Sequence, residues 1–133
     1  MSGQDVERIR SGVEAFNRGD IEAVLEGLDQ QVEWHVPPML PEQTVYHGHD
    51  GVRELWQSMR DSFDDFRLVI EEIVDAGDQV MVLAALHGRG TESGIEVETP
   101  SFGWVWTQRG GKALRVDVYP NRAEALQAVG LEP

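Results

Sequence analysis

The spacing of hydrophobic residues divides the chain into a helical first part and a second part dominated by strands. Val6, Ile9, Val13 and Phe16 recur at steps of three and four residues, which predicts a helix over about residues 4–18. Similar spacing predicts further helices over about 20–28 and 50–63, and a short last helix over 121–130. Alternation with a period of two predicts a strand at 31–36. Turn signals between the later segments predict strands at 66–75, 78–89, 95–107 and 113–119.

Residues that favour caps and turns mark the boundaries between these elements. Gly19 is expected to end the first helix, and Asp20 to cap the second through its side-chain oxygen. Asn121 and Glu124 have the spacing of a capping box for the last helix. The prolines within 37–44 exclude regular structure there and predict a loop that could rim a pocket. Pro100 interrupts a strand pattern, which predicts an edge position or a bulge.

Residues 80–86 lose the alternation and are apolar on both faces. A strand that is apolar on both sides needs cover on both sides. We therefore expect Met81, Leu83 and Ala85 to form a homodimer interface on the outer face of the sheet. The alternative is that the chain covers this strand itself.

Composition excludes several classes of protein but says little about which reaction the protein could catalyse. The 133 residues are expected to form one domain, 1–133, and they include no cysteine, which excludes disulfides and thiolate chemistry. The net charge of −13 disfavours binding to nucleic acid or to anionic membranes. The N-terminal residues lack the pattern of a signal peptide and no apolar run is long enough to span a bilayer, so we expect a cytoplasmic protein.

Two motifs give the sequence a family resemblance. Residues 19–23 read Gly-Asp-Ile-Glu-Ala, between the two predicted helices, and residues 46–56 read Tyr-His-Gly-His-Asp-Gly-Val-Arg-Glu-Leu-Trp, at the end of a strand and the start of a helix. With the order of the elements, they resemble the NTF2-like superfamily and its SnoaL-like branch, which includes relatives of polyketide cyclases and ketosteroid isomerase. The resemblance implies an α+β cone, in which N-terminal helices pack on a strongly curved, mostly antiparallel sheet that encloses a pocket.

The acid–base residues of three characterised relatives do not carry over to this chain. The tyrosine and two acids of ketosteroid isomerase would fall on Gly12, Val36 and Gly103. The arginine and two aspartates of limonene epoxide hydrolase would fall on Ala84, Leu86 and Val118. The histidine and aspartate of SnoaL-type cyclases would fall on Trp104 and Val118. The resemblance therefore implies the architecture without these catalytic constellations.

The same positions predict an apolar pocket that suits a small hydrophobic molecule. Its expected lining consists of Trp34, Val36, Trp56, Met59, Phe63, Val82, Ala84, Leu86, Trp104, Val116 and Val118. The alternative is a core that these side chains fill completely, because aromatic residues at such spacing are common in cores.

Three residues are candidates for acid–base chemistry. A bulge near Pro100 or in the first strand would turn Asp117 or His35 inward as an acid–base pair, and Tyr46 would lie at the pocket mouth as a polar donor. Plain alternation favours the other interpretation, an exposed or interfacial charge cluster with Tyr46 as a rim residue. His47 and His49 would face the same way only if 45–49 were extended, and we predict no metal site and no cofactor.

The sequence thus predicts a SnoaL-like protein that binds, and in one alternative isomerises, cyclises or hydrolyses, a small hydrophobic molecule without a cofactor. The other alternative is a non-catalytic ligand-binding or dimeric scaffold protein.

Overall fold

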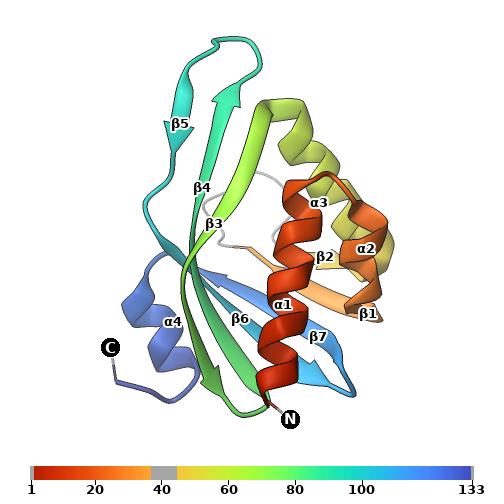
Figure 1. Ribbon diagram of the computed structural model, residues 1–133, viewed down its shortest axis with the longest axis vertical. Helices are drawn as coiled ribbons and strands as arrows, with labels where there is room; N and C mark the ends of the chain where they lie inside the picture. Colours follow the sequence, from red (N-terminus) through yellow and green to blue (C-terminus); the bar gives the residue numbers. More distant parts are fainter. Residues whose placement is uncertain (1, 37–44, 133) are drawn as a thin grey trace.

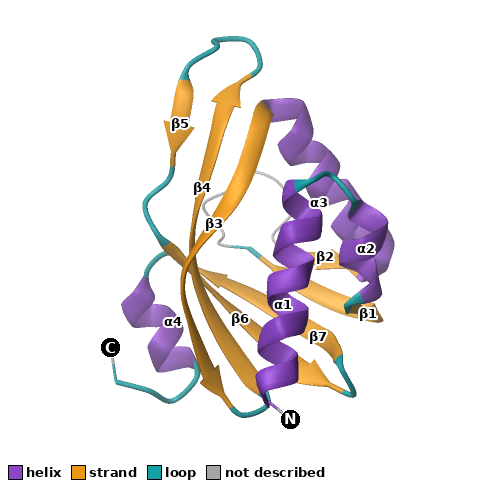
Figure 2. Cartoon of the chain, in the orientation of Figure 1, coloured by secondary structure: helices purple, strands orange, loops and turns teal. Residues whose placement is uncertain are grey.

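Three helices lie on one side of a curled sheet and a fourth lies on the other (Figures 1 and 2). The computed structural model describes residues 2–36 and 45–132, so the predicted loop 37–44 lies outside the described residues. The helices are α1 (Ser2–Asn17), α2 (Ile21–Glu26), α3 (Gly48–Ser62) and α4 (Arg122–Ala128). None of them is long and apolar enough to cross a membrane, within the part of the chain that the structure describes.

The sheet is mixed and does not close into a barrel. Its strands are β1 (Leu28–His35), β2 (Val45–His47), β3 (Phe63–Ala76), β4 (Gln79–Gly90), β5 (Glu96–Glu98), β6 (Phe102–Arg109) and β7 (Lys112–Tyr119). They follow the order β2-β1-β7-β6-β4-β3, and β5 pairs with β4 beyond the end of β6. Every pairing is antiparallel except that of β1 with β7. The predicted α+β fold with a curved, mostly antiparallel sheet is confirmed.

The predicted caps account for the starts of two helices. The Asp20 side chain accepts a hydrogen bond from Ala23 N at 3.2 Å, and the Asn121 side chain accepts one from Glu124 N at 2.9 Å. Gly19 separates α1 from α2 with φ of +80°, a left-handed conformation that glycine adopts without a Cβ penalty. These local signals were sufficient to place both helices.

The predicted strand 95–107 is wrong as a single element, because the chain interrupts it around Pro100. β5 ends at Glu98 and β6 begins at Phe102. Thr99 still follows β4: its N–H donates to Leu86 O, and its side-chain oxygen accepts from Leu86 N, both at 2.9 Å. Pro100 has no N–H to continue the ladder, so the pairing stops there.

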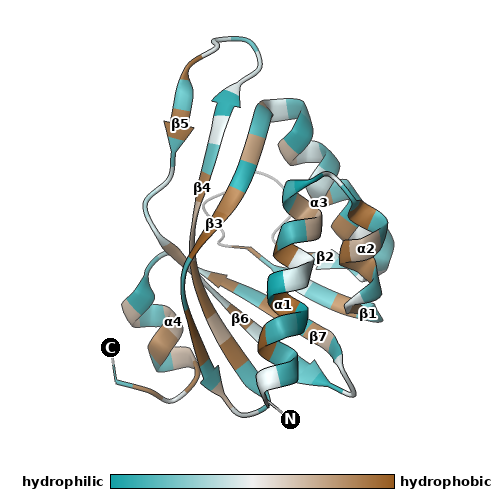
Figure 3. Ribbon diagram, viewed as in Figure 1, coloured by the Kyte–Doolittle hydropathy of each residue, from teal (hydrophilic) through white to brown (hydrophobic). Residues whose placement is uncertain are grey.

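A side-chain amide fixes α1 on the sheet. Asn17 Nδ2 donates to Leu68 O at 2.9 Å, and Leu68 N donates to Asn17 Oδ1 at 2.8 Å. The amide thus bonds to β3 as a neighbouring strand would, at the C-terminal end of α1. Buried apolar side chains from α1, α2 and α3 form one cluster with side chains of the sheet. Figure 3 shows the hydrophobic residues that lie along the strands and helices.

The outer face of the sheet is covered in part by α4. Met81 and Val105 are 0% and 1% exposed, and they form a cluster with Ala125 and Leu126 of α4, against which Leu83 also packs. The alternative interpretation of residues 80–86, that the chain covers this strand itself, is therefore confirmed for Met81. Leu83 packs against the same cluster and is partly buried.

The contact between α4 and the sheet depends on the small size of Gly103. A Cβ at Gly103 would overlap the Cβ of Ala125, so Gly103→Ala forces α4 away from β6. We expect a loss of about 1–3 kcal/mol in the free energy of unfolding, measured by urea denaturation. Adding Ala125→Gly removes the opposing methyl group and should restore part of the loss. A double variant no more stable than Gly103→Ala alone would contradict this packing.

Candidate ligand-binding site

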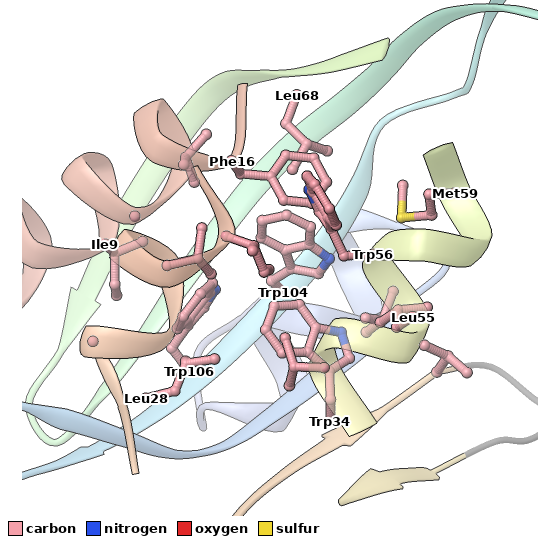
Figure 4. Close-up of a pocket in the computed structure, with 18 of the residues that line it drawn as sticks. Ile9, Phe16, Leu28, Trp34, Leu55, Trp56, Met59, Leu68, Trp104 and Trp106 are labelled. Atoms are coloured by element: carbon pink, nitrogen blue, oxygen red, sulfur yellow. The ribbon is translucent and has the colours of Figure 1, made fainter. Parts of the chain in front are cut away.

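A cavity of about 320 Å³ lies between the inner face of the sheet and helices α1, α2 and α3. All four tryptophans of the chain, Trp34, Trp56, Trp104 and Trp106, belong to its wall (Figure 4). Its volume falls within the range of small-molecule pockets. The side chains therefore do not fill the inside of the fold completely, as the alternative of a filled core would require.

Strand alternation builds the aromatic part of the wall. Trp104 and Trp106 lie two residues apart on β6 and face the same side of the sheet, and Trp34 joins them from β1. The ring centroid of Trp34 lies 5.9 Å from that of Trp104 and 5.4 Å from that of Trp106, both edge to face. Such contacts stabilise an aromatic cluster beyond simple burial of area.

Helix α3 supplies the opposite wall. Val52, Leu55, Trp56 and Met59 recur at helical spacing and all line the cavity. The guanidinium of Arg60 lies 4.9 Å from the centroid of the Trp56 ring, a cation–π contact.

Helix α1 closes the cavity over the sheet and leaves room at one position. Ile9, Val13 and Phe16 line the cavity, as does Gly12. A Cβ at Gly12 would meet no heavy atom within 4 Å, so the missing side chain leaves open space.

The polar groups of the wall are few, and they are mainly donors. Arg8 and Gln108 line the cavity beside the four indole rings. Among the described residues, the wall contains no aspartate, glutamate, histidine or tyrosine. The described wall can therefore donate hydrogen bonds to a ligand, but it offers no carboxylate, imidazole or phenol for proton transfer.

The structure brings most of the predicted pocket residues to this wall. Those that line the cavity are Trp34, Val36, Trp56, Met59, Phe63, Leu86, Trp104 and Val118. Val82, Ala84 and Val116 are outside the wall: each is 0% exposed and packs in the core beneath it. Several positions that correspond to catalytic residues of relatives, among them Gly12 and Val36, do face the cavity and are apolar here. Contact of any of these residues with a ligand stays a prediction.

His35 and Asp117 are neighbours in the sheet, but they lie away from the cavity. They are register partners across β1 and β7, one position beyond the inward-facing pair Trp34 and Val116. Asp117 is also opposite Val105, which α4 covers on the outer face. Neither His35 nor Asp117 belongs to the wall of the cavity.

The partners of these two residues show a charge cluster on the outer face. His35 Nε2 lies 2.9 Å from Glu33 Oε1, and Arg115 Nε donates to Asp117 Oδ2 at 2.9 Å. The hydrogen bond from His35 is the main cause that lowers the pKa of Glu33, and burial is the main cause that raises the pKa of Tyr119. Plain alternation favoured this arrangement, a charge cluster away from the pocket. A catalytic role of His35 and Asp117 stays a prediction, and neither residue lines the cavity.

Tyr46 lies in the interior and not at a pocket mouth. It pairs with Trp34 on β2, is 5% exposed, and does not belong to the cavity wall. Gly51 of α3 packs so closely on it that a Cβ there would come within 3.0 Å of the Tyr46 backbone.

The extended conformation of residues 45–49 that would make His47 and His49 face the same way is not present. Helix α3 begins at Gly48, so residues 45–49 are not one strand, and His49 Nε2 lies 2.9 Å from Leu28 O. Across the described ranges 2–36 and 45–132, no three His, Asp or Glu side chains are grouped to hold a metal ion.

The pocket residues predicted from the sequence did not include Trp106, Gln108, Arg8 or the residues of α1 that line the cavity. The signal for Trp106 was present, because it lies two residues after Trp104 and strand alternation places both on one face. The apolar stripe of α1 was recognised, but only the fold shows that it faces a cavity. The same alternation places Gln108, two residues after Trp106, on that face as well.

Solved structures with the same fold cover nearly the whole chain. A protein of the NTF2-like class and of unknown function from Burkholderia pseudomallei K96243 is 24% identical, with 95% of this chain and 97% of that one covered and a TM-score of 0.79. TerC, crystallised with polyporic acid, is 25% identical over 96% and 98% of the two chains, with a TM-score of 0.78. A putative polyketide cyclase from Xanthomonas campestris pv. campestris is 26% identical over 96% and 98%, with a TM-score of 0.71.

A comparison with curated proteins gave no match. The model of the SnoaL-like domain, in contrast, matches residues 9–116, which span every element from α1 to β7. The resemblance expected from the two motifs is thereby confirmed: this chain belongs to the SnoaL-like domain family, with the NTF2-like fold.

Proposed function

We propose that the protein binds a small, uncharged, hydrophobic molecule in its cavity. The observation that carries the proposal is the composition of the wall, which is apolar and aromatic except for Arg8 and Gln108 in the described residues. Burial of apolar surface favours such a ligand by roughly 25 cal/mol per Å². TerC, crystallised with polyporic acid, supports the use of this fold to hold a small organic molecule.

Cyclase or isomerase chemistry is the second candidate. The family assignment and the relative described as a putative polyketide cyclase favour it. The wall contributes N–H donors, which can stabilise negative charge that develops on an oxygen during a reaction. The described part of the wall contains no base, so its residues alone do not supply the proton acceptor that such a reaction needs. Binding is therefore the function that the geometry supports best.

Filling the cavity from Gly12 tests the proposal. Gly12→Leu places a side chain in open space at the cavity wall and improves helix propensity by roughly 0.5–1 kcal/mol, so the fold should be as stable as before. We expect the variant to lose at least tenfold in affinity for the neutral probe N-phenyl-1-naphthylamine, measured by fluorescence titration.

Gly3→Leu is the matched control. Gly3 also lies in α1, and a Cβ there would meet no heavy atom within 4 Å, but Gly3 is outside the cavity wall. This variant should bind the probe like the unsubstituted protein. Equal affinity in Gly12→Leu and Gly3→Leu, with both proteins folded by thermal melting, would refute the cavity as the binding site.

A second test concerns the acid–base candidates. Because His35 and Asp117 lie outside the wall, the double variant His35→Ala, Asp117→Asn should keep its probe affinity within about twofold at every pH from about 5 to 8. Loss of the His35 hydrogen bond should raise the pKa of Glu33 toward its ordinary value, which NMR titration of the carboxyl group measures. Loss of binding in this variant would show that the pair acts on the cavity.

We also propose a homodimer through the outer face of the sheet, at a different part of that face from the one expected from the sequence. Since α4 covers Met81 and Leu83 packs against the same cluster, a second copy would use the neighbouring surface, where Glu33, His35 and Arg115 bring together charges of both signs. A cytoplasmic location likewise stays a prediction. We expect light scattering to give twice the chain mass of 14.9 kDa, and a clean monomer would contradict the dimer.

A further inference from the structure

Arg8 belongs both to the wall of the cavity and to the surface of the protein. Its side chain is 46% exposed, and it lines the cavity together with buried residues such as Ile9 and Trp106. Every other described residue of the wall is buried or only partly exposed. Arg8 is therefore the place where the described wall has most contact with solvent.

The residues around Arg8 form one end of the cavity. Figure 4 shows Ile9, Leu28 and Trp106 together at this end, and they come from α1, the start of β1, and β6. Ala113 N donates to Gly27 O at 2.9 Å, just before Leu28. This hydrogen bond fixes the start of β7, and with it the turn between β6 and β7, beside the same end of the cavity.

The guanidinium of Arg8 lies on this turn. A Cβ at Gly111 would come within 3.0 Å of Arg8 Cζ, and within 3.2 and 3.3 Å of its two terminal nitrogens. Gly111 has φ of +81°, which glycine adopts without a Cβ penalty. The turn therefore presents bare backbone to the guanidinium, and the Arg8 side chain spans the space between α1 and the β6–β7 turn.

An exposed ion pair within α1 holds the Arg8 side chain in this position. Its Nη1 donates to Asp5 Oδ1 at 3.0 Å, three residues earlier in the same helix. Such pairs contribute little to stability and are screened by salt. Exposed side chains change rotamer within nanoseconds, so Arg8 can turn away while the backbone around it keeps its place.

We propose that Arg8 is the gate of a passage into the cavity, between α1 and the β6–β7 turn, and that its ion pair with Asp5 keeps the passage closed. When the side chain turns outward, a small neutral molecule reaches the indole rings from solvent. When the ion pair forms again, the guanidinium returns to the Gly111 backbone. The proposal concerns access to the cavity and holds for any molecule that occupies it.

Acrylamide quenching of tryptophan fluorescence tests the passage without a ligand. Acrylamide is small and neutral and quenches the indoles that it contacts, and all four tryptophans line the cavity. We expect Arg8→Ala to raise the Stern–Volmer constant about twofold or more, because truncation leaves the passage open. Arg10→Ala is the matched control: Arg10 is exposed on the same helix, carries the same charge and lies outside the wall. It should be quenched like the unsubstituted protein.

Asp5→Asn distinguishes a mobile gate from a fixed plug. The variant keeps Arg8 and removes the charge that holds it, so the side chain should leave the passage more often. We expect a Stern–Volmer constant between those of the unsubstituted protein and Arg8→Ala. Sodium chloride at about 0.5 M should increase quenching of the unsubstituted protein more than that of Arg8→Ala, because it screens the ion pair.

The binding rates of N-phenyl-1-naphthylamine, measured by stopped-flow fluorescence, give a second readout. A gate changes how fast the probe enters and leaves, but not how tightly the cavity holds it. We expect Arg8→Ala to raise the association and dissociation rate constants by the same factor, about threefold or more, with Kd unchanged within about twofold. Because the probe is neutral, loss of a charge does not alter its attraction to the protein.

The outcomes separate the gate from the proposed function. Equal quenching of Arg8→Ala, Arg10→Ala and the unsubstituted protein, all folded by thermal melting, would overturn the passage. Quenching that rises in Arg8→Ala but not in Asp5→Asn would show a fixed plug and overturn the gate. Faster dissociation alone, with weaker binding, would make Arg8 a ligand contact and also overturn it. If quenching follows the expectation but the probe does not bind, the gate is supported and the proposed binding function fails.

Discussion

The parallel pairing of β1 with β7 determines which side chains meet on each side of the sheet. It aligns Trp34 with Val116 toward the helices and His35 with Asp117 on the outer face. Because successive residues of a strand point to opposite faces, a slip of one residue would exchange the two sets. A slip of β1 would bring an imidazole to the inner face in place of an indole, and a slip of β7 would bring a carboxylate in place of an isopropyl group. The apolar character of the site thus depends on this register.

The indole cluster gives the cavity its shape as well as its chemistry. Trp34, Trp104 and Trp106 pack edge to face on the sheet, while Trp56 approaches from α3. Gly12 faces them from α1 and contributes no side chain, so space remains between helix and sheet. In the wall, large aromatic rings provide apolar contact area and a few N–H groups provide hydrogen-bond donors.

Local signals in the sequence predicted the helices and strands better than they predicted what packs against each of them. The Asp20 and Asn121 caps depend on neighbouring residues only, so the sequence alone placed them. The cover over Met81 comes from α4, more than forty residues later in the chain, and no pattern within 80–86 distinguishes it from a second molecule. For the same reason Val82 was assigned to the pocket: alternation gives the face of a residue, but not whether a larger neighbour lies above it.

All the tryptophans of the protein line one cavity, with centroid separations of 5.4–5.9 Å among Trp34, Trp104 and Trp106. Chromophores this close share their excited states, so their circular dichroism is that of a coupled system rather than of separate rings. The near-ultraviolet spectrum of the folded chain is therefore dominated by one small region of its interior. A small rotation of a single indole there alters the band shape of the whole protein.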